Sequence, residues 1–310
     1  MRKKSVNSLT IAVAIPTYNR EQVLINTIQH VMAQGRAADE ILVIDQTPEH
    51  DASVARQLSQ WNADGSICWL KQNEANLSAA RNRALLEATS DIVIFLDDDV
   101  VLSQDFIRSH EESFADEKTK IVAGQIVAAD KPVHTGDIDD FELGFPLSHD
   151  RSAWIKNIGG GNFSVYRDLA IEVGGFDQRF YRVAYREDSD FLFRFCTHYE
   201  CLAKYVPEAS LVHLAECSGG CESRRAAFDP LACSGSIGEH YFTLKNVGIG
   251  QALCNFAYRV VRPRCGRYAF NRPWLLPLMG FREIFAFTAA TLQVFRGRIL
   301  LVPQPVTKSV

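Results

Sequence analysis

The chain of 310 residues is long enough for one large hydrophobic core or two closely joined ones, and its 47% apolar and 23% charged residues are typical of a globular protein. A formal net charge of −4 gives no electrostatic reason to expect nucleic acid as a partner. With neither a secretory signal nor an apolar stretch of membrane-spanning length in the sequence, we expect a cytoplasmic protein, at most held at the inner face of the membrane.

The first hundred residues alternate between strand and helix patterns. Short runs rich in Val, Ile and Leu predict buried strands, and apolar residues three and four apart predict helices between them. The expected strands are 11–15, 40–44, 67–70 and 92–96, and the expected helices are 20–32, 52–61 and 78–89. This order indicates βαβ units, and therefore an α/β fold with a mostly parallel sheet and right-handed crossovers.

The alternation is lost beyond residue 102. The elements expected there are a strand over 121–127, a long aperiodic loop over 128–152 and helices over 104–114, 168–173 and 188–198. A last helix, over 281–295, is apolar with arginines near its ends. Such a helix either lies on a membrane surface or packs back on its own domain.

Three consecutive aspartates, Asp97, Asp98 and Asp99, follow the strand expected at 92–96. Adjacent like charges repel, so the triplet is costly unless something positive lies among its members. Ligands of open α/β sheets bind at the carboxyl ends of the strands, and a divalent cation shared with a diphosphate would fit there. The alternative is a solvated acidic turn. Asp98 should point away from its two neighbours and is expected to be structural.

The first strand ends in a group of polar and aromatic residues. These residues could stack on a base and bind a diphosphate, with added positive potential from the following helix N-terminus; a simple capped loop is the alternative. They are Pro16, Thr17, Tyr18 and Arg20.

Two further positions precede or begin predicted helices. Asn76 stands before the helix 78–89, and Arg81 on that helix is placed to contact a nucleotide or to pair with an aspartate of the triplet. A purely structural ion pair is the alternative for Arg81.

A run of three glycines lies at 159–161. Glycine lets the backbone approach a ligand closely and present its N–H groups without side-chain obstruction. The alternative is a plain flexible loop.

Several of these segments, in this order, resemble family 2 inverting glycosyltransferases of GT-A fold. They are Ile15-Pro16-Thr17-Tyr18-Asn19-Arg20, Val43-Ile44-Asp45, Asn76 with Ala80-Arg81-Asn82, Leu96-Asp97-Asp98-Asp99, Gly160-Gly161-Asn162-Phe163-Ser164, Val173-Gly174-Gly175-Phe176-Asp177 and Tyr185-Arg186-Glu187-Asp188-Ser189-Asp190. The resemblance implies a Rossmann-like central sheet flanked by helices. It also implies a nucleotide-sugar-binding half at 1–102, an acceptor and catalytic half at 103–245, and a helical extension at 246–310.

The resemblance also implies a role for each candidate residue. Asp188 would be the general base that takes a proton from the acceptor hydroxyl, and Glu187 would orient it or contact the acceptor. Asp99 would hold Mn2+ or Mg2+, helped by Asp97, which also faces the ribose, and by His213; a histidine satisfied elsewhere is the alternative for His213. The residues expected to bind the nucleotide sugar are Pro16, Thr17, Tyr18, Arg20, Asp45, Asn76, Arg81, Asp97, Gly160, Gly161 and Asn162.

The implied reaction is transfer of a sugar, with inversion and with help from a metal, to an acceptor hydroxyl. The expected partners are a nucleotide-diphosphate sugar donor and a saccharide or lipid-linked acceptor, in cell-envelope polysaccharide or glycolipid synthesis, with peripheral membrane association. Two other functions stay open at this point, a non-catalytic nucleotide-sugar-binding homologue and a nucleotidyltransferase.

Overall fold

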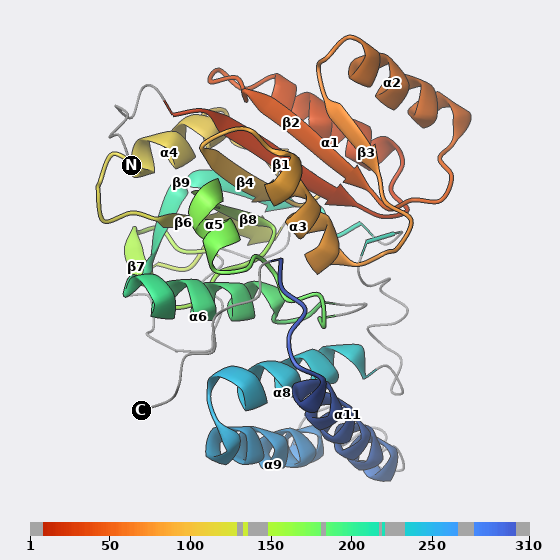
Figure 1. Ribbon diagram of the computed structural model, residues 1–310, viewed down its shortest axis with the longest axis vertical. Helices are drawn as coiled ribbons and strands as arrows, with labels where there is room; N and C mark the ends of the chain where they lie inside the picture. Colours follow the sequence, from red (N-terminus) through yellow and green to blue (C-terminus); the bar gives the residue numbers. More distant parts are fainter. Residues whose placement is uncertain are drawn as a thin grey trace.

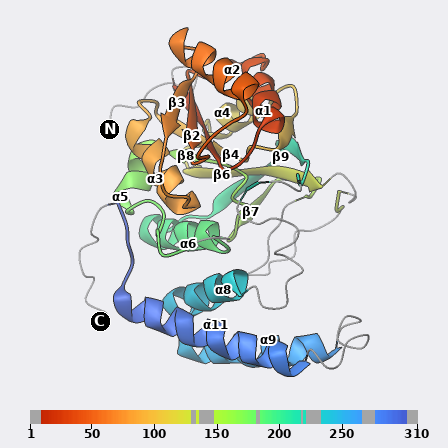
Figure 2. The same ribbon diagram turned by 90° about the vertical axis from the view of Figure 1, so that its right-hand side faces the viewer.

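A nine-stranded mixed sheet forms the centre of the computed structural model, which describes residues 9–128, 133–135, 148–180, 184–216, 219–220, 233–265 and 276–301. Helices cover both faces of the sheet, and three more helices form a separate layer beside it (Figures 1 and 2). Eight of the strands follow the order β3-β2-β1-β4-β8-β6-β9-β5, with β7 paired to β9.

The first four strands confirm the predicted parallel arrangement. They are β1 (Ile11–Thr17), β2 (Glu40–Asp45), β3 (Cys68–Lys71) and β4 (Ile92–Leu96), with α1 (Gln22–Met32), α2 (Ala52–Ala63) and α3 (Leu77–Glu87) between them. Strand β1 extends two residues further than expected, because it stays paired with β2 through Thr17 and Asp45. The three strands β1, β2 and β4 therefore end at one edge, where the predicted polar groups gather.

The second half of the sheet is largely antiparallel, and the sequence analysis predicted only part of it. Its strands are β5 (Val100–Leu102), β6 (Ile121–Ala128), β7 (Ala153–Ile155), β8 (Asn162–Tyr166) and β9 (Ala203–His213). Strand β8 was missed because its apolar pattern is broken by Asn162 and Ser164. Both side chains are buried and bond to the His110 ring.

Each face of the sheet has its own hydrophobic core. In β1, Ile11, Val13 and Ile15 pack on one face and Ala12 and Ala14 on the other, as the period of two in a strand requires. The first core includes α1, α2 and α4 (Phe106–Ser113), and the second includes α3, α5 (Arg167–Glu172) and α6 (Glu187–Tyr199).

The remaining helices are α8 (Ser234–Asn246), α9 (Ile249–Cys265) and α11 (Leu276–Arg296). The helix predicted over 281–295 is the main part of α11. Figure 2 shows α8 between the α/β domain and the other two helices. Beyond α11 the chain returns to the domain, where the Ile299 amide donates to Asp177 and the Leu301 amide to the Gly174 carbonyl.

Two expectations from the sequence can be compared only with the described residues. The predicted loop over 128–152 lies mainly outside the described residues. Among the helices in the described part of the chain, none has both the length and the apolar character needed to cross a bilayer.

Candidate active site

A cavity of about 580 Å³ opens at the edge where β1, β2 and β4 end. This volume is in the range of sites for small organic ligands. Most of the predicted site residues line it, namely Pro16, Thr17, Tyr18, Arg20, Arg81, Asp97, Asp99, Gly160, Gly161, Glu187, Asp188 and His213.

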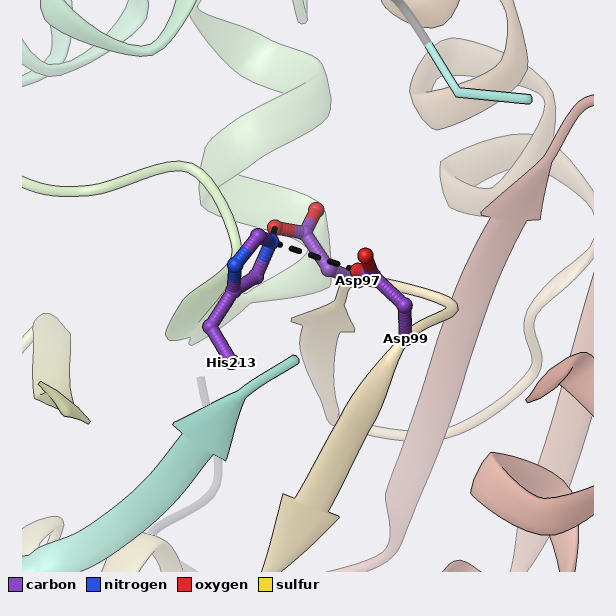
Figure 3. Close-up of side chains that lie close together, drawn as sticks. All are labelled: Asp97, Asp99 and His213. Atoms are coloured by element: carbon purple, nitrogen blue, oxygen red, sulfur yellow. Dashed lines mark ion pairs between the residues drawn. The ribbon is translucent and has the colours of Figure 1, made fainter. Parts of the chain in front are cut away.

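Asp97, Asp99 and His213 form a group whose oxygen and nitrogen atoms lie within 4.8 Å of one another (Figure 3). The His213 Nε2 atom is 3.2 Å from Asp99 Oδ1 and 3.7 Å from Asp97 Oδ2. Two carboxylates and an imidazole are suitable ligands for a divalent cation. This group could therefore bind a metal ion.

Strand pairing explains how residues more than a hundred positions apart meet here. Strand β5 begins directly after the acidic triplet and pairs antiparallel with β9, so that Val100 lies opposite His213. The pairing carries the imidazole to the Asp99 side chain. Because β5 has only three residues, no periodic pattern in the sequence predicts this contact.

The positive charge that the triplet needs comes from Arg20. Its Nε atom is 3.2 Å from Asp98 Oδ1, and its Nη2 atom is 3.1 Å from Asp99 Oδ2. Asp98 is buried and also accepts a hydrogen bond from the Thr17 hydroxyl at 2.7 Å. Asp98 thus bonds to the end of β1 and to the loop after it, and it also lines the cavity, so its structural role stays a prediction.

The charges of the group shift the pKa values of its members. Burial alone would raise the pKa of Asp99, but the hydrogen bond from His213, the Glu216 amide and the nearby Arg20 charge together lower it. The hydrogen bond to Asp99 raises the pKa of His213. Asp99 is therefore kept ionised, as a metal ligand must be.

Asp188 lies across the cavity at the start of α6. Its Oδ2 atom accepts a hydrogen bond from the Gly160 amide at 2.8 Å, and its Oδ1 atom accepts one from the Ser189 amide at 2.7 Å. Burial raises the pKa of Asp188, although Arg81 and these two amides act in the opposite direction. A carboxylate held in this way is oriented and more basic than an ordinary aspartate.

Gly160 and Gly161 lie between Asp188 and the metal-ligand group. A Cβ atom on Gly160 would lie 2.8 Å from Arg81 Nη2 and 3.0 Å from Asp188 Oδ2, and one on Gly161 would overlap the Asp97 carboxylate. A side chain at either position would therefore displace one of these groups. The close approach of the glycine backbone to a ligand stays a prediction.

Arg81 forms an ion pair with Glu187 and donates a hydrogen bond to the Gly160 carbonyl at 2.6 Å. Both partners of the ion pair are nearly fully buried. The pair links α3, the glycine segment and α6 beneath the cavity. Glu187 is in this way fixed beside Asp188, which suits an orienting role.

Three predicted nucleotide-sugar residues have side chains that lie outside the cavity. Asp45 is fully buried and accepts hydrogen bonds from Thr47, His50, Trp69 and Lys71.

The other two of these residues bond to nearby backbone. Asn76 caps α3 by accepting from the Ala79 amide at 3.0 Å, and Asn162 donates to the carbonyls of Gln125 and Ala209. All three side chains, including that of Asp45, are committed to the fold, and their contact with a donor stays a prediction.

The sequence analysis missed other residues that line the cavity, among them Gln46, Tyr185, Arg186 and Glu216. Gln46 follows directly after Asp45, and Tyr185 and Arg186 stand in the segment before Asp188, so position next to a motif was an available signal. Glu216 offered none, since its contacts with Asp99 and Arg20 are backbone hydrogen bonds, which its amide donates and its carbonyl accepts.

The fold and the cavity together define an α/β protein with a polar cavity at its strand ends and a group that could bind a metal ion. The profile of the family described as "Glycosyl transferase family 2" matches residues 12–175, which is more than half of the chain. The protein therefore belongs to glycosyl transferase family 2.

Curated relatives match parts of the chain. "Glycosyltransferase GlyA" of Streptococcus pneumoniae is 28% identical over 115 residues, which is 37% of this chain and 16% of the relative. "Glucosyl-dolichyl phosphate glucuronosyltransferase" of Haloferax volcanii is 22% identical over 178 residues, 54% of this chain and 56% of the relative. The chain thus spans less than two thirds of the length of either relative.

Solved structures agree with the predicted GT-A fold. GalNAc-T7 with UDP, GalNAc and Mn2+ superposes over 93% of this chain and 57% of its own, with a TM-score of 0.62 and 13% identity. The mannosyltransferase PcManGT from Pyrobaculum calidifontis, in complex with GDP-Man and Mn2+, covers 93% of this chain and 74% of its own, with a TM-score of 0.54 and 18% identity. The GT-A prediction is confirmed.

Proposed function

We propose that the protein is a metal-dependent inverting glycosyltransferase that moves a sugar from a nucleotide-diphosphate sugar to an acceptor hydroxyl. The observation that carries this proposal is the arrangement of the cavity. A possible metal-ligand group and an oriented carboxylate line the same cavity of about 580 Å³, on either side of Gly160 and Gly161.

Asp97, Asp99 and His213 would hold the metal ion. When bound, a divalent cation supplies positive charge that stabilises the departing nucleoside diphosphate. Mg2+ prefers an all-oxygen shell, whereas an imidazole beside two carboxylates is better suited to Mn2+. We therefore place Mn2+ ahead of Mg2+. The Mn2+ in the complexes of GalNAc-T7 and PcManGT supports this choice.

Asp188 would act as the general base. Its carboxylate takes the proton of the acceptor hydroxyl while the hydroxyl oxygen attacks the anomeric carbon, and the bond from that carbon to the diphosphate breaks on the opposite face. The hydrogen bond from the Gly160 amide fixes the carboxylate, and the raised pKa makes it a better proton acceptor. The residues after β1, from Pro16 to Arg20, would contact the nucleotide.

We place the acceptor among saccharides or lipid-linked saccharides of the cell envelope, and the protein at the inner face of the membrane. The name of the Haloferax volcanii relative, which acts on a dolichyl phosphate derivative, supports a lipid-linked acceptor. The exposed apolar helices described below support the location.

A panel of UDP-, GDP- and dTDP-sugars, incubated with the protein and a candidate acceptor with Mn2+, Mg2+ or EDTA, tests the proposal. We expect one donor to release its nucleoside diphosphate with Mn2+ and none with EDTA. Donor binding without release would indicate a non-catalytic homologue. Release of pyrophosphate from a nucleoside triphosphate would indicate a nucleotidyltransferase.

A further inference from the structure

The outer face of the C-terminal helices is apolar. Eleven of the eighteen large hydrophobic side chains that are exposed in the described residues belong to the segment 249–299. They include Phe281, Phe285 and Phe295 on α11, with exposed fractions of 70%, 62% and 83%. Isolated exposed hydrophobic residues are ordinary, but a cluster of this density marks an interaction site.

The spacing shows that the exposed residues of α11 form one face. Leu278, Phe281, Phe285, Leu292 and Phe295 recur at intervals of three, four and seven, as residues on one side of a helix do. In α9, the exposed residues Ile249, Leu253, Tyr258 and Val261 are spread over a wider side of the helix. We call the exposed apolar residues of the two helices together the outer face.

The inner sides of the same helices are partly polar. On α11 the buried positions are Glu283, Ala286 and Ala290. Glu283 Oε1 accepts a hydrogen bond from Ser236 of α8, and Oε2 accepts one from Arg259 of α9 and is 3.1 Å from His240 Nε2. These contacts, with Phe287 packed on the His240 ring, fix the inner side against α8.

The charge of this part of the chain is opposite to that of the rest. Residues 249–310 contain nine arginines and lysines against one acidic residue, the buried Glu283, whereas residues 1–248 contain 24 basic and 36 acidic residues. The helical segment thus has a net charge of +8 and the remainder −12. A segment with a net positive charge and an apolar helical face complements an anionic lipid surface.

We propose that the outer face of α9 and α11 docks on an anionic lipid bilayer, with the phenylalanines in the interface and the net positive charge of this part of the chain drawn to the headgroups. This proposal deepens the membrane location given above and rests on that part of the proposed function. Helix α8 connects the face to the cavity, since the Arg186 guanidinium beside Asp188 is 2.9 Å from Glu239 of α8. Docking would therefore hold the cavity one helix layer from the bilayer.

Sedimentation of the full chain with vesicles tests this proposal without donor or acceptor. We expect binding to vesicles of equal parts phosphatidylcholine and phosphatidylglycerol, weaker binding as salt rises, and little binding to phosphatidylcholine alone. The double substitution Phe281→Ser and Phe285→Ser should reduce the partition coefficient by roughly tenfold or more. The matched control is Leu86→Ser, an exposed leucine on α3.

Two results would overturn the proposal. One is equal binding of the wild-type chain and the double variant to anionic vesicles. The other is a wild-type chain that does not bind vesicles and has the mass of a dimer in light scattering, with the double variant monomeric; the outer face would then be a contact between two copies. Circular dichroism checks that the double variant is folded. Failure of vesicle binding together with normal sugar transfer would remove the docking surface and leave the proposed reaction intact.

Discussion

In the strand-end cavity, charged side chains face an open space and apolar strands lie beneath them, whereas in the helical layer a charged network is buried and apolar side chains face outward. Asp97 and His213 line the cavity, while Glu283 lies inside the layer with His240 and Arg259. Under the proposed function, the open polar residues would bind metal and donor, whereas the enclosed ones hold the helices together. The predictions below test each half of this contrast.

The largest effect is expected in the cavity, from Asp188→Asn. This change keeps the size of the side chain but removes the proton acceptor, so kcat should fall by about 10² to 10⁴. The donor KM should change little, because Asp188 contacts the glycine segment and not the metal-ligand group. Steady-state kinetics with the donor found in the panel measures both values, and unchanged turnover would show that another group is the base.

In the helical layer, Glu283→Ala should lower the free energy of unfolding rather than the rate of sugar transfer. The substitution leaves His240, Arg259 and Arg282 without their shared carboxylate partner, and removing one member of a buried ion pair costs about 3–5 kcal/mol.

Urea denaturation measures this loss, with Glu87→Ala as the control. Glu87 is half-exposed and pairs with Arg83 at 3.5 Å, so its loss should cost at most about 1 kcal/mol. Equal free energies of unfolding for the two variants would contradict the cohesive role of the buried network.

A smaller and more local effect is expected from Gly161→Ala. The added methyl group would overlap the Asp97 carboxylate and push it from the metal-ligand group. Overpacking of this kind costs about 1–3 kcal/mol, and activity should fall, with a higher Mn2+ concentration needed for half of the maximal rate. Gly35→Ala is the matched control, because a Cβ atom there meets nothing within 4 Å. If both variants kept wild-type activity, the glycine run would have no part in the site.

The smallest effect is on the pH profile. Asp188 must be ionised to act as a base, and burial raises its pKa. The rate should therefore decline as pH falls, and the decline should begin at a higher pH than an ordinary aspartate would cause. A profile of kcat against pH at saturating donor measures this. If the rate stayed constant down to the pH at which an ordinary aspartate becomes protonated, Asp188 would not be the proton acceptor.

The parallel half of the sheet could be predicted from sequence because its strands are short apolar runs and its helices have clear periodicity. In the other half, the strand predicted at 121–127 corresponds to β6, whereas β5, β7 and β8 were not predicted, since β5 and β7 have three residues each and β8 contains the buried polar residues Asn162 and Ser164. Their polar partner is His110 of α4, which lies 52 and 54 positions away in the sequence.

Most motif residues at strand ends line one cavity, as the sequence predicted, whereas the side chains of a few motif residues turn inward. Asp45 and Asn76 belong to the motifs, yet their hydrogen bonds are to the protein itself. Sequence cannot show which way such a side chain turns. Nor could it show that the apolar side of α11 faces outward, because the helix pattern is the same for either orientation.

The measurement that tests the account most directly is a titration of Mn2+, followed by electron paramagnetic resonance, into the wild-type chain and Asp99→Asn with UDP or GDP present. We predict one bound Mn2+ per wild-type chain with the nucleotide of the correct donor, and loss of that bound ion in Asp99→Asn. Unchanged Mn2+ binding in Asp99→Asn would contradict the assignment of the metal to Asp97, Asp99 and His213.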